Sequence, residues 1–350
     1  MNEEAGEIGR TSSARGRTVG RPPLRPLLPG LLLCATIAMA AGFMANQYGG
    51  PQVLYALLIG LALHTVGSEG ALEPGVNFCS RTLLRLGVAL LGARITLPVI
   101  FDLGWSSAVL IALAVVLTIG LGWLLSRALR LPFEQGIVSG GSVAICGVSA
   151  ALALASIFPR KPETERFTLL VAAGVTLLST LAMMVYPLLS KLLNFTVVQT
   201  GLFLGGSIHD VAQVVAAGMI VSQSAADSAT VVKLFRVALL VPVVLTLALA
   251  IGVRSRSFAE QTARPPLLPS FLVAFCVLVG LSSAGFIPAP AVDAASAGSR
   301  WLLVLAIAAV GVKSSPAELL RMGWAPAILL VSETVFIGAL VLTGAWLIGR

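Results

Sequence analysis

The chain has 350 residues, of which 57% are hydrophobic and only 11% are charged. Soluble domains carry about 25% charged residues, so most of this protein's surface must face something other than water. The net charge of +8 fits the enrichment of Lys and Arg in the cytoplasmic loops of membrane proteins. No basic stretch is interleaved with aromatic residues, and we expect an integral membrane protein with no nucleic-acid partner.

The chain begins with a polar stretch, residues 1–26, whose Arg, Glu, Gly, Ser and Pro content is typical of disorder. We expect this stretch to be a basic cytoplasmic tail and residues 27–350 to form a single transmembrane domain. The tripeptide Ala-Met-Ala at 38–40 resembles a signal-peptidase site, but the apolar run around it is long for a signal peptide. We therefore expect a retained first membrane span.

A membrane-spanning helix needs about 20 predominantly apolar residues, and the sequence predicts an all-α polytopic protein with about eleven membrane segments. They are expected at 27–45, 51–66, 81–99, 103–126, 135–158, 166–190, 198–221, 229–253, 267–287, 299–312 and 323–349.

The distribution of Lys and Arg orients these segments. With the amino terminus inside the cell, most basic clusters fall inside and the carboxyl terminus falls outside. The basic cluster at 160–166 lies inside only if 135–158 and 198–221 are both re-entrant, so that each returns to the side of the membrane from which it starts. The sequence leaves open whether these two segments span or re-enter. We expect a multi-pass protein of the bacterial plasma (inner) membrane.

An internal repeat links two distant parts of the chain. The pattern Gly, basic residue, Gly, Trp occurs with identical spacing within 92–105 and within 311–324, and Leu residues at 83–86 match those at 302–305 at the same offset. The matching segments are separated by an odd number of spans, which predicts inverted repeats of the kind found in secondary transporters. Chance identity between Gly- and Leu-rich helices is the alternative.

Two apolar segments contain a Gly-Gly-Ser interruption, at 140–142 and 205–207. An interrupted backbone in lipid leaves unpaired N–H and C=O groups, so it persists only where protein or a water-filled cavity covers it. Paired interruptions predict two discontinuous helices, crossing or re-entrant, with a substrate site near the middle of the membrane.

The second interruption carries ionisable groups. Ser207 is expected to cap the following half-helix, and Asp210 completes a Ser-x-x-Asp capping pattern. Helix capping alone is therefore one explanation for the polar residues in this apolar segment. That explanation leaves out His209 and Gln213. Ionisable groups at membrane depth usually face a cavity or a proton relay, and histidine exchanges protons near neutrality, so we predict that His209 and Asp210 couple transport to protons.

The first interruption has the same pattern without charge. Ser142 is expected to cap a half-helix, while Gly147 and Ser149 allow a ligand or another backbone to approach closely. A helix N-terminus carries about half a positive elementary charge and favours anions. Two such ends facing each other predict an anion site, with tight helix packing through small residues as the alternative.

Several cations lie in or beside apolar segments. Lys233 and Arg236 share a helix face and are predicted either to line an anion path or to pair with a carboxylate such as Asp210. Arg81 and Arg85 likewise share a face.

Arg94 and Lys313 each end an apolar run and are expected to extend to the lipid headgroups. His64 and Glu333 are expected to be hydrogen-bonded structural residues. The four cysteines show no metal or disulfide spacing and are expected to be small buried residues.

Four stretches together resemble the YeiH-like family of bacterial inner-membrane proteins, which are often described as sulfate exporters. They lie at 78–97 (FCSRTLLRLGVALLGARITL), 144–150 (AICGVSA), 207–213 (SIHDVAQ) and 229–242 (ATVVKLFRVALLVP). The resemblance implies a relation to the cation:proton antiporter and anion transporter group, whose folds contain inverted repeats with unwound helices. The family's motif positions fall on Cys146, Gly147, Ser149, His209, Asp210, Gln213, Lys233 and Arg236. The antiporter branch commonly uses a carboxylate pair, which this chain lacks, so direct sodium/proton exchange is disfavoured.

The sequence therefore predicts a secondary transporter, expected to export a small anion such as sulfate or an organic sulfonate or carboxylate, with protons as the coupling ion. The alternatives are a cation/proton antiporter and a non-transporting membrane partner or intramembrane enzyme, although no hydrolase or kinase motif occurs. No enzyme activity, cofactor or metal is predicted, the expected partners are the anion, protons and the lipid bilayer, and a homo-oligomer is left open. The predicted proton-coupling residues are His209 and Asp210, and the predicted substrate-binding residues are Gly141, Ser142, Cys146, Gly147, Ser149, Gly206, Ser207, Gln213, Lys233 and Arg236.

Overall fold

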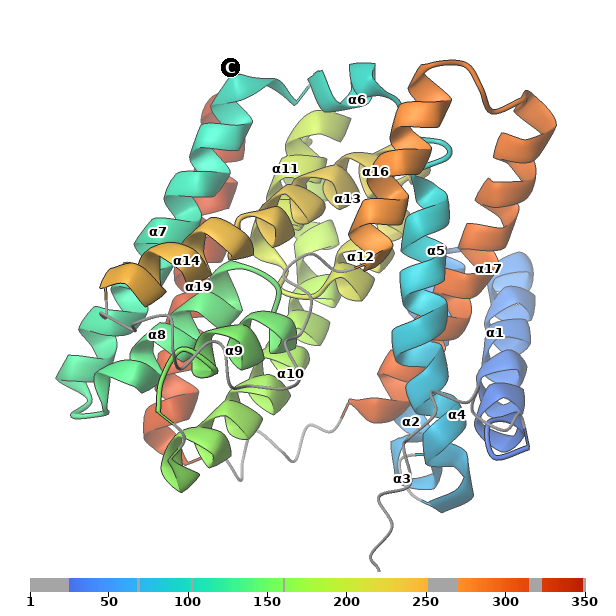
Figure 1. Cartoon of the computed structure of the whole chain (residues 1–350). Helices are drawn as coiled ribbons and strands as arrows, with labels where there is room; N and C mark the ends of the chain where they lie inside the picture. The colour runs from blue at the N-terminus through green and yellow to red at the C-terminus, as the bar shows by residue number, and fades with distance from the viewer. Residues whose placement is uncertain are drawn as a thin grey trace, which may run out of the picture.

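The structure is a computed structural model that describes residues 25–67, 70–101, 103–159, 161–250, 270–314 and 323–348. Helices account for all of the regular secondary structure in these ranges, which confirms the predicted all-α class. The helices gather into two bundles that lie side by side in Figure 1. The predicted tail at 1–26 lies outside the described residues except for its last two.

Within the described ranges, six helical stretches are long and apolar enough to cross a membrane. They are Leu28–Tyr48, Gly104–Ala128, Pro162–Leu192, Gln223–Ala250, Ala289–Lys313 and Trp324–Ile348. Each rises by about 1.5 Å per residue, so 20 residues cover the roughly 30 Å hydrocarbon layer. The protein is therefore built as a multi-pass membrane protein, while the count of about eleven segments stays a prediction.

The first bundle contains the amino-terminal helices and two helices from the last third of the chain. It consists of α1 (Leu28–Tyr48), α2 (Gln52–Ala62), α3 (His64–Gly67), the 3-10 turn η1 (Gly70–Leu72), α4 (Glu73–Phe78), the π-helical turn η2 (Cys79–Leu83), α5 (Leu84–Leu91), α16 (Ser270–Ser283) and α17 (Ala289–Lys313). Helix α17 packs against α1, α2 and α5. Its contact with α2 is close because Gly60 and Gly311 bring the two backbones together, and a side chain at either position would collide with the opposite backbone.

The second bundle contains the middle of the chain and the last helix. It consists of α7 (Gly104–Ala128), α8 (Phe133–Ala144), α9 (Val148–Ala155), α10 (Pro162–Leu192), α11 (Val197–Ser207), α12 (Val211–Val221), α13 (Gln223–Ala238), α14 (Leu240–Ala250) and α19 (Trp324–Ile348). The short helix α6 (Leu97–Phe101) connects the bundles at the upper end of Figure 1. Helix α12 also packs against α2 and α17 of the first bundle.

Both predicted interruptions are present, but each lies a few residues beyond the Gly-Gly-Ser sequence. The helix is broken at 145–147, between α8 and α9, and again at 208–210, between α11 and α12. Gly147 has φ +64°, a conformation that glycine adopts without steric penalty. The Gly-Gly-Ser triplets are themselves helical. Their small residues allow close packing between helices: Gly141 lies against Leu154, and Gly206 lies against Ile111 and Val341.

Each broken segment returns to the side from which it starts. Phe133, at the start of α8, packs edge-to-face on Phe158, beyond α9, with ring centroids 5.6 Å apart. Lys161 Nζ lies 3.4 Å from Glu134 Oε1, which joins the same two ends. At the other hairpin, Lys191 at the end of α10 donates to the carbonyl of Ile220 at the end of α12. The α8–α9 and α11–α12 pairs are thus re-entrant hairpins.

The two hairpins approach each other from opposite ends of the bundle. Helix α10 runs between them: it begins beside the ends of the α8–α9 hairpin and finishes beside the ends of the α11–α12 hairpin. Its 31 residues are long enough to cross a membrane. The tips of both hairpins therefore lie near the middle of the membrane. Of the two possibilities that the sequence left open, spanning or re-entry, the structure has re-entry.

The parts of the chain that carry the sequence repeat are alike in structure. Gly104 and Gly323 both have positive φ, +70° and +79°, and each is immediately followed by a Trp. Helices α7 and α19, which start there, both contain 25 residues. Helix α5 packs against α17, and α7 against α19, and the members of each pair run in opposite directions in Figure 1.

Two predicted segments begin well before the residue at which the sequence indicated their start. The segment expected at 81–99 begins at Glu73, because α4, η2 and α5 follow one another without interruption. The segment expected at 299–312 begins at Ala289, because Pro288 forms its N-cap and a less apolar Ala- and Ser-rich stretch supplies its first turns.

Candidate functional site

The tips of the two hairpins touch each other through His209. The ring Nδ1 of this residue lies 3.1 Å from the carbonyl oxygen of Val143, at the end of α8. Its Nε2 lies 3.0 Å from the hydroxyl of Thr334 on α19. The ring is completely buried, so His209 connects both hairpins to α19.

The predicted capping by Ser142 and Ser207 is wrong. Ser142 Oγ donates to the carbonyl of Gly147, and Ser207 Oγ donates to the carbonyl of Phe203, because both serines still lie within the incoming helix. The second half-helix is capped by Asp210 instead, whose carboxylate accepts a hydrogen bond of 3.1 Å from Ala212 N–H. The N-cap of α9 is Gly147, which has no side chain to offer.

Ser179 on α10 supports the second tip and is not among the residues predicted from the sequence. Its hydroxyl accepts hydrogen bonds from the backbone N–H groups of His209 and Asp210, at 3.2 and 3.1 Å. The same hydroxyl donates to Gln213 Oε1. Ser179 thus satisfies the N–H groups that the break leaves unpaired, and nothing in a lone serine within an apolar helix indicates this.

Lys233 binds both tips from α13. Its ammonium group donates to the carbonyls of Ile145 and Ile208, the second at 2.9 Å. The side chain is completely buried. Both acceptors lie at the breaks, where the last carbonyls of a helix have no intrahelical partner.

Arg236, one turn further along α13, binds the same two tips. Its guanidinium donates to the carbonyls of Val143 and Ala144 at the first tip and of Gly205 and Ile208 at the second. This side chain is also completely buried. The carbonyls at the two breaks take up the N–H groups of Arg236 and two of the three N–H groups of Lys233. The predicted substrate-binding role of these two residues stays a prediction.

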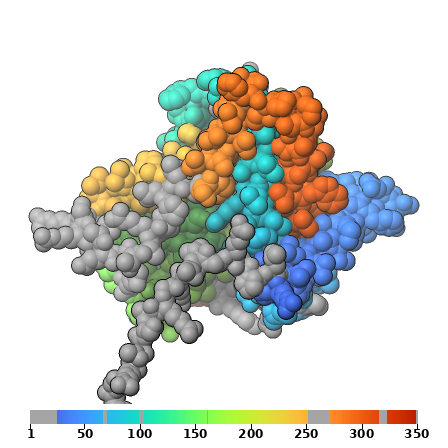
Figure 2. All heavy atoms as spheres, turned by 45° about the vertical axis from the view of Figure 1, so that its right-hand side comes forward, coloured from blue at the N-terminus to red at the C-terminus, as the bar shows by residue number. Residues whose placement is uncertain are grey.

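A cavity of about 350 Å³ lies in front of the tips, between the two bundles. Figure 2 shows this boundary, where α5 in cyan and α16–α17 in orange meet the green and gold surface of the second bundle. Four of the predicted site residues line the cavity: Cys146, Ser149, Asp210 and Gln213. The first turns of α9 and α12 also face it, through Val148 and Val211, and the first N–H groups of a helix lack intrahelical partners. At the start of α12, Ser179 and the Asp210 carboxylate already accept hydrogen bonds from such groups.

The first bundle contributes three cations to this cavity. Arg81, Arg85 and Lys313 line it, and all three side chains are exposed. Asp210 is the acidic residue of the lining, and Lys313 is close enough to Arg81, Glu73 and Asp210 to interact with all three charges. The cavity is therefore positively charged on balance.

The backbone around Arg81 is unusual. Residues Cys79–Leu83 form a π-helical turn inserted before α5, and Ser80 and Arg81 of this turn both line the cavity. Single π-helical turns inside α-helices occur frequently at functional sites. The i, i+4 spacing of Arg81 and Arg85 could have indicated this surface, and the expectation that Lys313 extends to headgroups is wrong because the cavity receives it.

The cavity extends from the tips toward one end of the molecule. Helix α9 lines it with Ser149 and Leu152 as it runs back toward the end where α8 starts. Arg81 and Arg85 lie near the beginning of the α5 helix, whereas Arg94 follows its end. Over such a stretch a helix rises by about 14 Å or more, so Arg94 lies well beyond the cavity, toward the other end.

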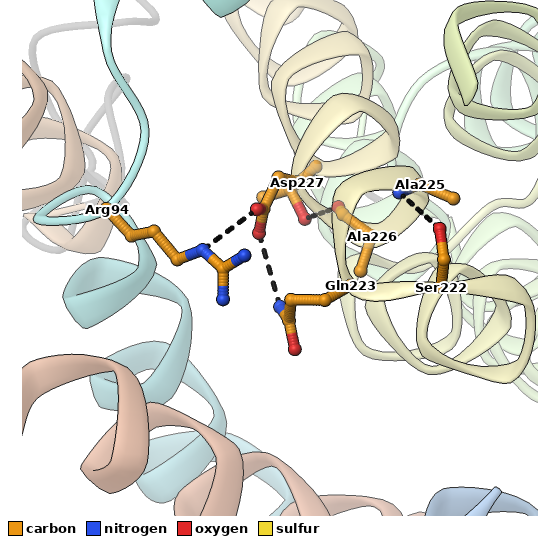
Figure 3. A network of polar contacts seen from close by, with 7 residues as sticks. Arg94, Ser222, Gln223, Ala225, Ala226 and Asp227 are labelled. Carbon is orange, nitrogen blue, oxygen red and sulfur yellow. Dashed lines mark hydrogen bonds and ion pairs between the residues drawn. The ribbon is translucent and has the colours of Figure 1, made fainter. Parts of the chain in front are cut away.

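An ion pair joins the bundles at that other end (Figure 3). Arg94 Nε lies 3.2 Å from Asp227 Oδ2 on α13, and the exposed fractions of the two side chains are 36% and 11%. Gln223 Nε2 donates to the other carboxylate oxygen of Asp227. Arg94 therefore has a protein partner and does not need the lipid headgroups.

The two lone polar residues of the sequence analysis have hydrogen-bonded positions, as expected. His64 Nδ1 lies 2.7 Å from the carbonyl of Val312 and links α3 to α17. Glu333 is buried on α19 and accepts a hydrogen bond of 2.8 Å from Ser139 Oγ, while its second oxygen has no partner among the described residues. In the described residues no His, Cys, Asp and Glu cluster has metal-binding geometry.

Comparison with known proteins identifies the family of this chain. Residues 29–330 match the family model described as Conserved hypothetical protein 698. A relative from Paracoccus pantotrophus, UPF0324 membrane protein TauZ, is 45% identical over 322 residues, which cover 92% of this chain and 95% of the relative. UPF0324 membrane proteins of Chlorobaculum tepidum and Rhizobium meliloti are 45% and 43% identical, over 90% and 92% of this chain and 88% and 93% of theirs.

Among solved structures, the sodium proton antiporter MjNhaP1 from Methanocaldococcus jannaschii matches 88% of this chain and 97% of its own, with 13% identity and a TM-score of 0.28. A score this low supports no conclusion about fold or function. The sequence relatives, in contrast, are bacterial proteins that match nearly the whole chain. The chain is therefore a multi-pass membrane protein that belongs to the Conserved hypothetical protein 698 (UPF0324, YeiH-like) family.

Proposed function

We propose that this protein is a secondary transporter that carries a small anion, such as sulfate or an organic sulfonate or carboxylate, across the bacterial inner membrane. The observation that carries the proposal is the cavity between the bundles. One wall presents Arg81, Arg85 and Lys313, and the other presents the starts of two half-helices. Helix N-termini and basic side chains both favour anions, and here they converge on one space.

The position of this cavity suits alternating access. Its cations belong to one bundle and its helix ends to the other, so a rocking motion between the bundles changes which side of the membrane the cavity faces. Arg94 and Asp227 hold the bundles together at the far end. In this arrangement the anion has access from the end where α8 starts and not from the end that the ion pair closes.

The positive-inside rule gives this arrangement a direction. The chain enters α8 just after Arg127 and Arg130, and basic residues beside short loops favour the cytoplasm. The cavity then faces the cytoplasm, the amino terminus is inside and the carboxyl terminus outside. A cavity open to the cytoplasm is the state in which an exporter takes up its substrate.

Asp210 and His209 take different parts in the proposed coupling. Asp210 lines the cavity, where it can exchange a proton with water and where its charge opposes that of an anion. His209 lies behind it, buried and bonded to Val143 and Thr334, and it positions the tip that carries Asp210. Protonation of Asp210 therefore removes the negative charge from the cavity and favours anion binding, so the proton and the anion move in the same direction and export follows the outward gradient of the anion.

The alternatives proposed from the sequence receive less support. Cation/proton exchange requires a negatively charged binding site, whereas this cavity has three cations and one carboxylate. An enzyme would need an activated nucleophile in the cavity, and no side-chain base is hydrogen-bonded to the thiol of Cys146 among the described residues. We therefore propose a transporter without enzymatic activity.

Flux measurements in proteoliposomes test the proposed function. The wild-type protein is expected to move labelled sulfate or a small organic sulfonate or carboxylate, faster when a pH gradient supplies protons. Asp210→Asn keeps a residue that can cap α12 and should abolish the pH dependence, while His209→Ala should lower the rate by disturbing the tip. Undiminished pH-dependent flux in both variants refutes the coupling role, and sodium-driven proton movement without anion flux favours the antiporter alternative.

A further inference from the structure

The size of the cavity is informative about its ligand. A water molecule occupies about 30 Å³ of liquid, and the cavity measures about 350 Å³. Sites for small organic molecules usually measure about 300–1,000 Å³. A bare oxyanion such as sulfate, with four oxygens around one atom, leaves most of this space unfilled.

The walls of the cavity are divided into a charged part and an apolar part. Leu84 and Val88 follow Arg81 and Arg85 on the same face of α5, and Phe271 of α16 extends this apolar surface. Leu240, at the start of α14, lies on the wall of the other bundle. Sulfate has no apolar surface to place against these side chains, whereas a carbon chain has.

We infer that the physiological ligand is an organic anion, a sulfonate or carboxylate on a short carbon chain, and not bare sulfate. The anionic group binds between Arg81, Arg85 and Lys313, and the carbon chain lies against Leu84, Val88 and Phe271. This inference rests on the proposed function, because it concerns the same cavity. It adds the class of substrate, which anion transport alone leaves open.

Three alkanesulfonates that share one singly charged head group, with sulfate as the doubly charged ion that has no carbon chain, test the inference. The dissociation constants of sulfate, methanesulfonate, propanesulfonate and hexanesulfonate are measured from the thermal stabilisation of the full-length protein in detergent, since a ligand that binds the folded state raises its stability. Each methylene that becomes buried should tighten binding about four-fold, which corresponds to roughly 0.8 kcal/mol. Sulfate is expected to bind most weakly, and the gain is expected to stop when the chain outgrows the cavity.

Two variants separate the contribution of the ligand's anionic head group to binding from that of its carbon chain. Phe271→Ala should reduce the gain per methylene and leave sulfate binding unchanged, whereas Arg85→Gln should weaken every member of the series. Phe286→Ala is the matched control, because Phe286 is exposed beyond the end of α16 and does not line the cavity. The series measured on the wild-type protein needs no variant, so a folding defect of Phe271→Ala leaves the test intact.

The possible outcomes distinguish the two proposals. Sulfate bound as tightly as propanesulfonate, with affinity independent of chain length, overturns the organic-anion inference and leaves anion transport standing. Stabilisation by none of the four anions, together with absent flux, overturns both. Tightening along the series that Phe271→Ala abolishes and Phe286→Ala retains supports the inference.

Discussion

Two groups of cations lie within a short distance of the hairpin tips, and they have opposite environments. Lys233 and Arg236 are completely buried and donate to backbone carbonyls of both tips. Arg81, Arg85 and Lys313 are exposed and face the cavity. The first group compensates for interrupted helices, and the second group leaves its donors available to a ligand.

The comparison teaches that the partner of a cation, and not its depth in an apolar segment, indicates its role. Every buried carbonyl at a helix end needs a donor, and two re-entrant hairpins that meet at mid-depth bring several such carbonyls together. Lys233 and Arg236 satisfy this requirement with most of their N–H groups. The cations across the cavity have no comparable carbonyl acceptors among the hydrogen bonds of the described residues, so an anion is the natural partner.

The largest effect is expected from Arg236→Gln. The carbonyls of Ala144 and Gly205 would lose their side-chain donor, while those of Val143 and Ile208 would keep His209 and Lys233. Each buried acceptor left unpaired costs about 1–3 kcal/mol, so we expect the free energy of unfolding to fall by roughly 2–6 kcal/mol. Lys233→Met orphans the carbonyl of Ile145 alone and should cost about 1–3 kcal/mol.

Thermal or denaturant unfolding in detergent measures both changes. Arg127→Gln is the control, because Arg127 lies on α7 against the ring of Trp123 and has no contact with the tips. If Arg236→Gln unfolds like the wild type but no longer binds anions, the division between the two groups of cations is wrong.

The converse substitution on the cavity side should change binding and not stability. Arg85→Gln removes one charged donor from the cavity, and a hydrogen bond to a charged group contributes about 1.5–3 kcal/mol. We expect anion affinity to fall by about 10- to 100-fold, with an unchanged unfolding temperature in the absence of ligand. Lys313→Gln should behave alike, and a clear loss of stability in both variants would contradict the comparison.

A third substitution addresses the first tip. Gly147 has φ +64° and ψ −125°, outside the left-handed helical region, and a non-glycine residue held in such a sparsely populated conformation costs about 1–3 kcal/mol. The nearest atoms to an added methyl group lie 3.6 Å away on Val175 and 3.9 Å away on His209, so strain and not collision is the cause. We expect Gly147→Ala to lower stability by about that amount, and Gly120→Ala, which meets nothing within 4 Å, to lower neither stability nor transport.

Much of the architecture could be predicted from the sequence, because hydrophobic length and Gly-Gly-Ser interruptions act locally. The positions of the breaks could not, since Gly140, Gly141 and their counterparts serve helix packing while Gly147 forms the turn. Lys233 and Arg236 were recognised as unusual, but their acceptors lie between 25 and 93 residues away in the chain. Ser179 could not be recognised at all, because its importance comes from the backbone that it meets.

The smallest effect is expected from substitutions in the Arg94–Asp227 ion pair, which joins the two bundles. The Arg94 side chain is 36% exposed, whereas that of Asp227 is 11% exposed and keeps its hydrogen bond from Gln223 when Arg94 is replaced. Ion pairs with a solvent-exposed partner contribute only about 0.2–1 kcal/mol. Arg94→Gln should therefore shift the ratio of inward- to outward-facing protein by no more than about five-fold, without lowering stability.

Cys146 offers a native reporter of this ratio, because it lines the cavity. With Cys276, the exposed free cysteine, replaced by Ser, the rate of labelling by a membrane-impermeant maleimide applied from one side reports which side the cavity faces. Arg94→Gln and Asp227→Asn should both raise labelling from the side that the ion pair closes, whereas the double exchange Arg94→Asp with Asp227→Arg should restore the wild-type rate. Equal labelling in all of these variants would show that the pair does not hold the bundles together. The cations of this protein would then divide into only two groups, those that hold backbone and those that face the cavity.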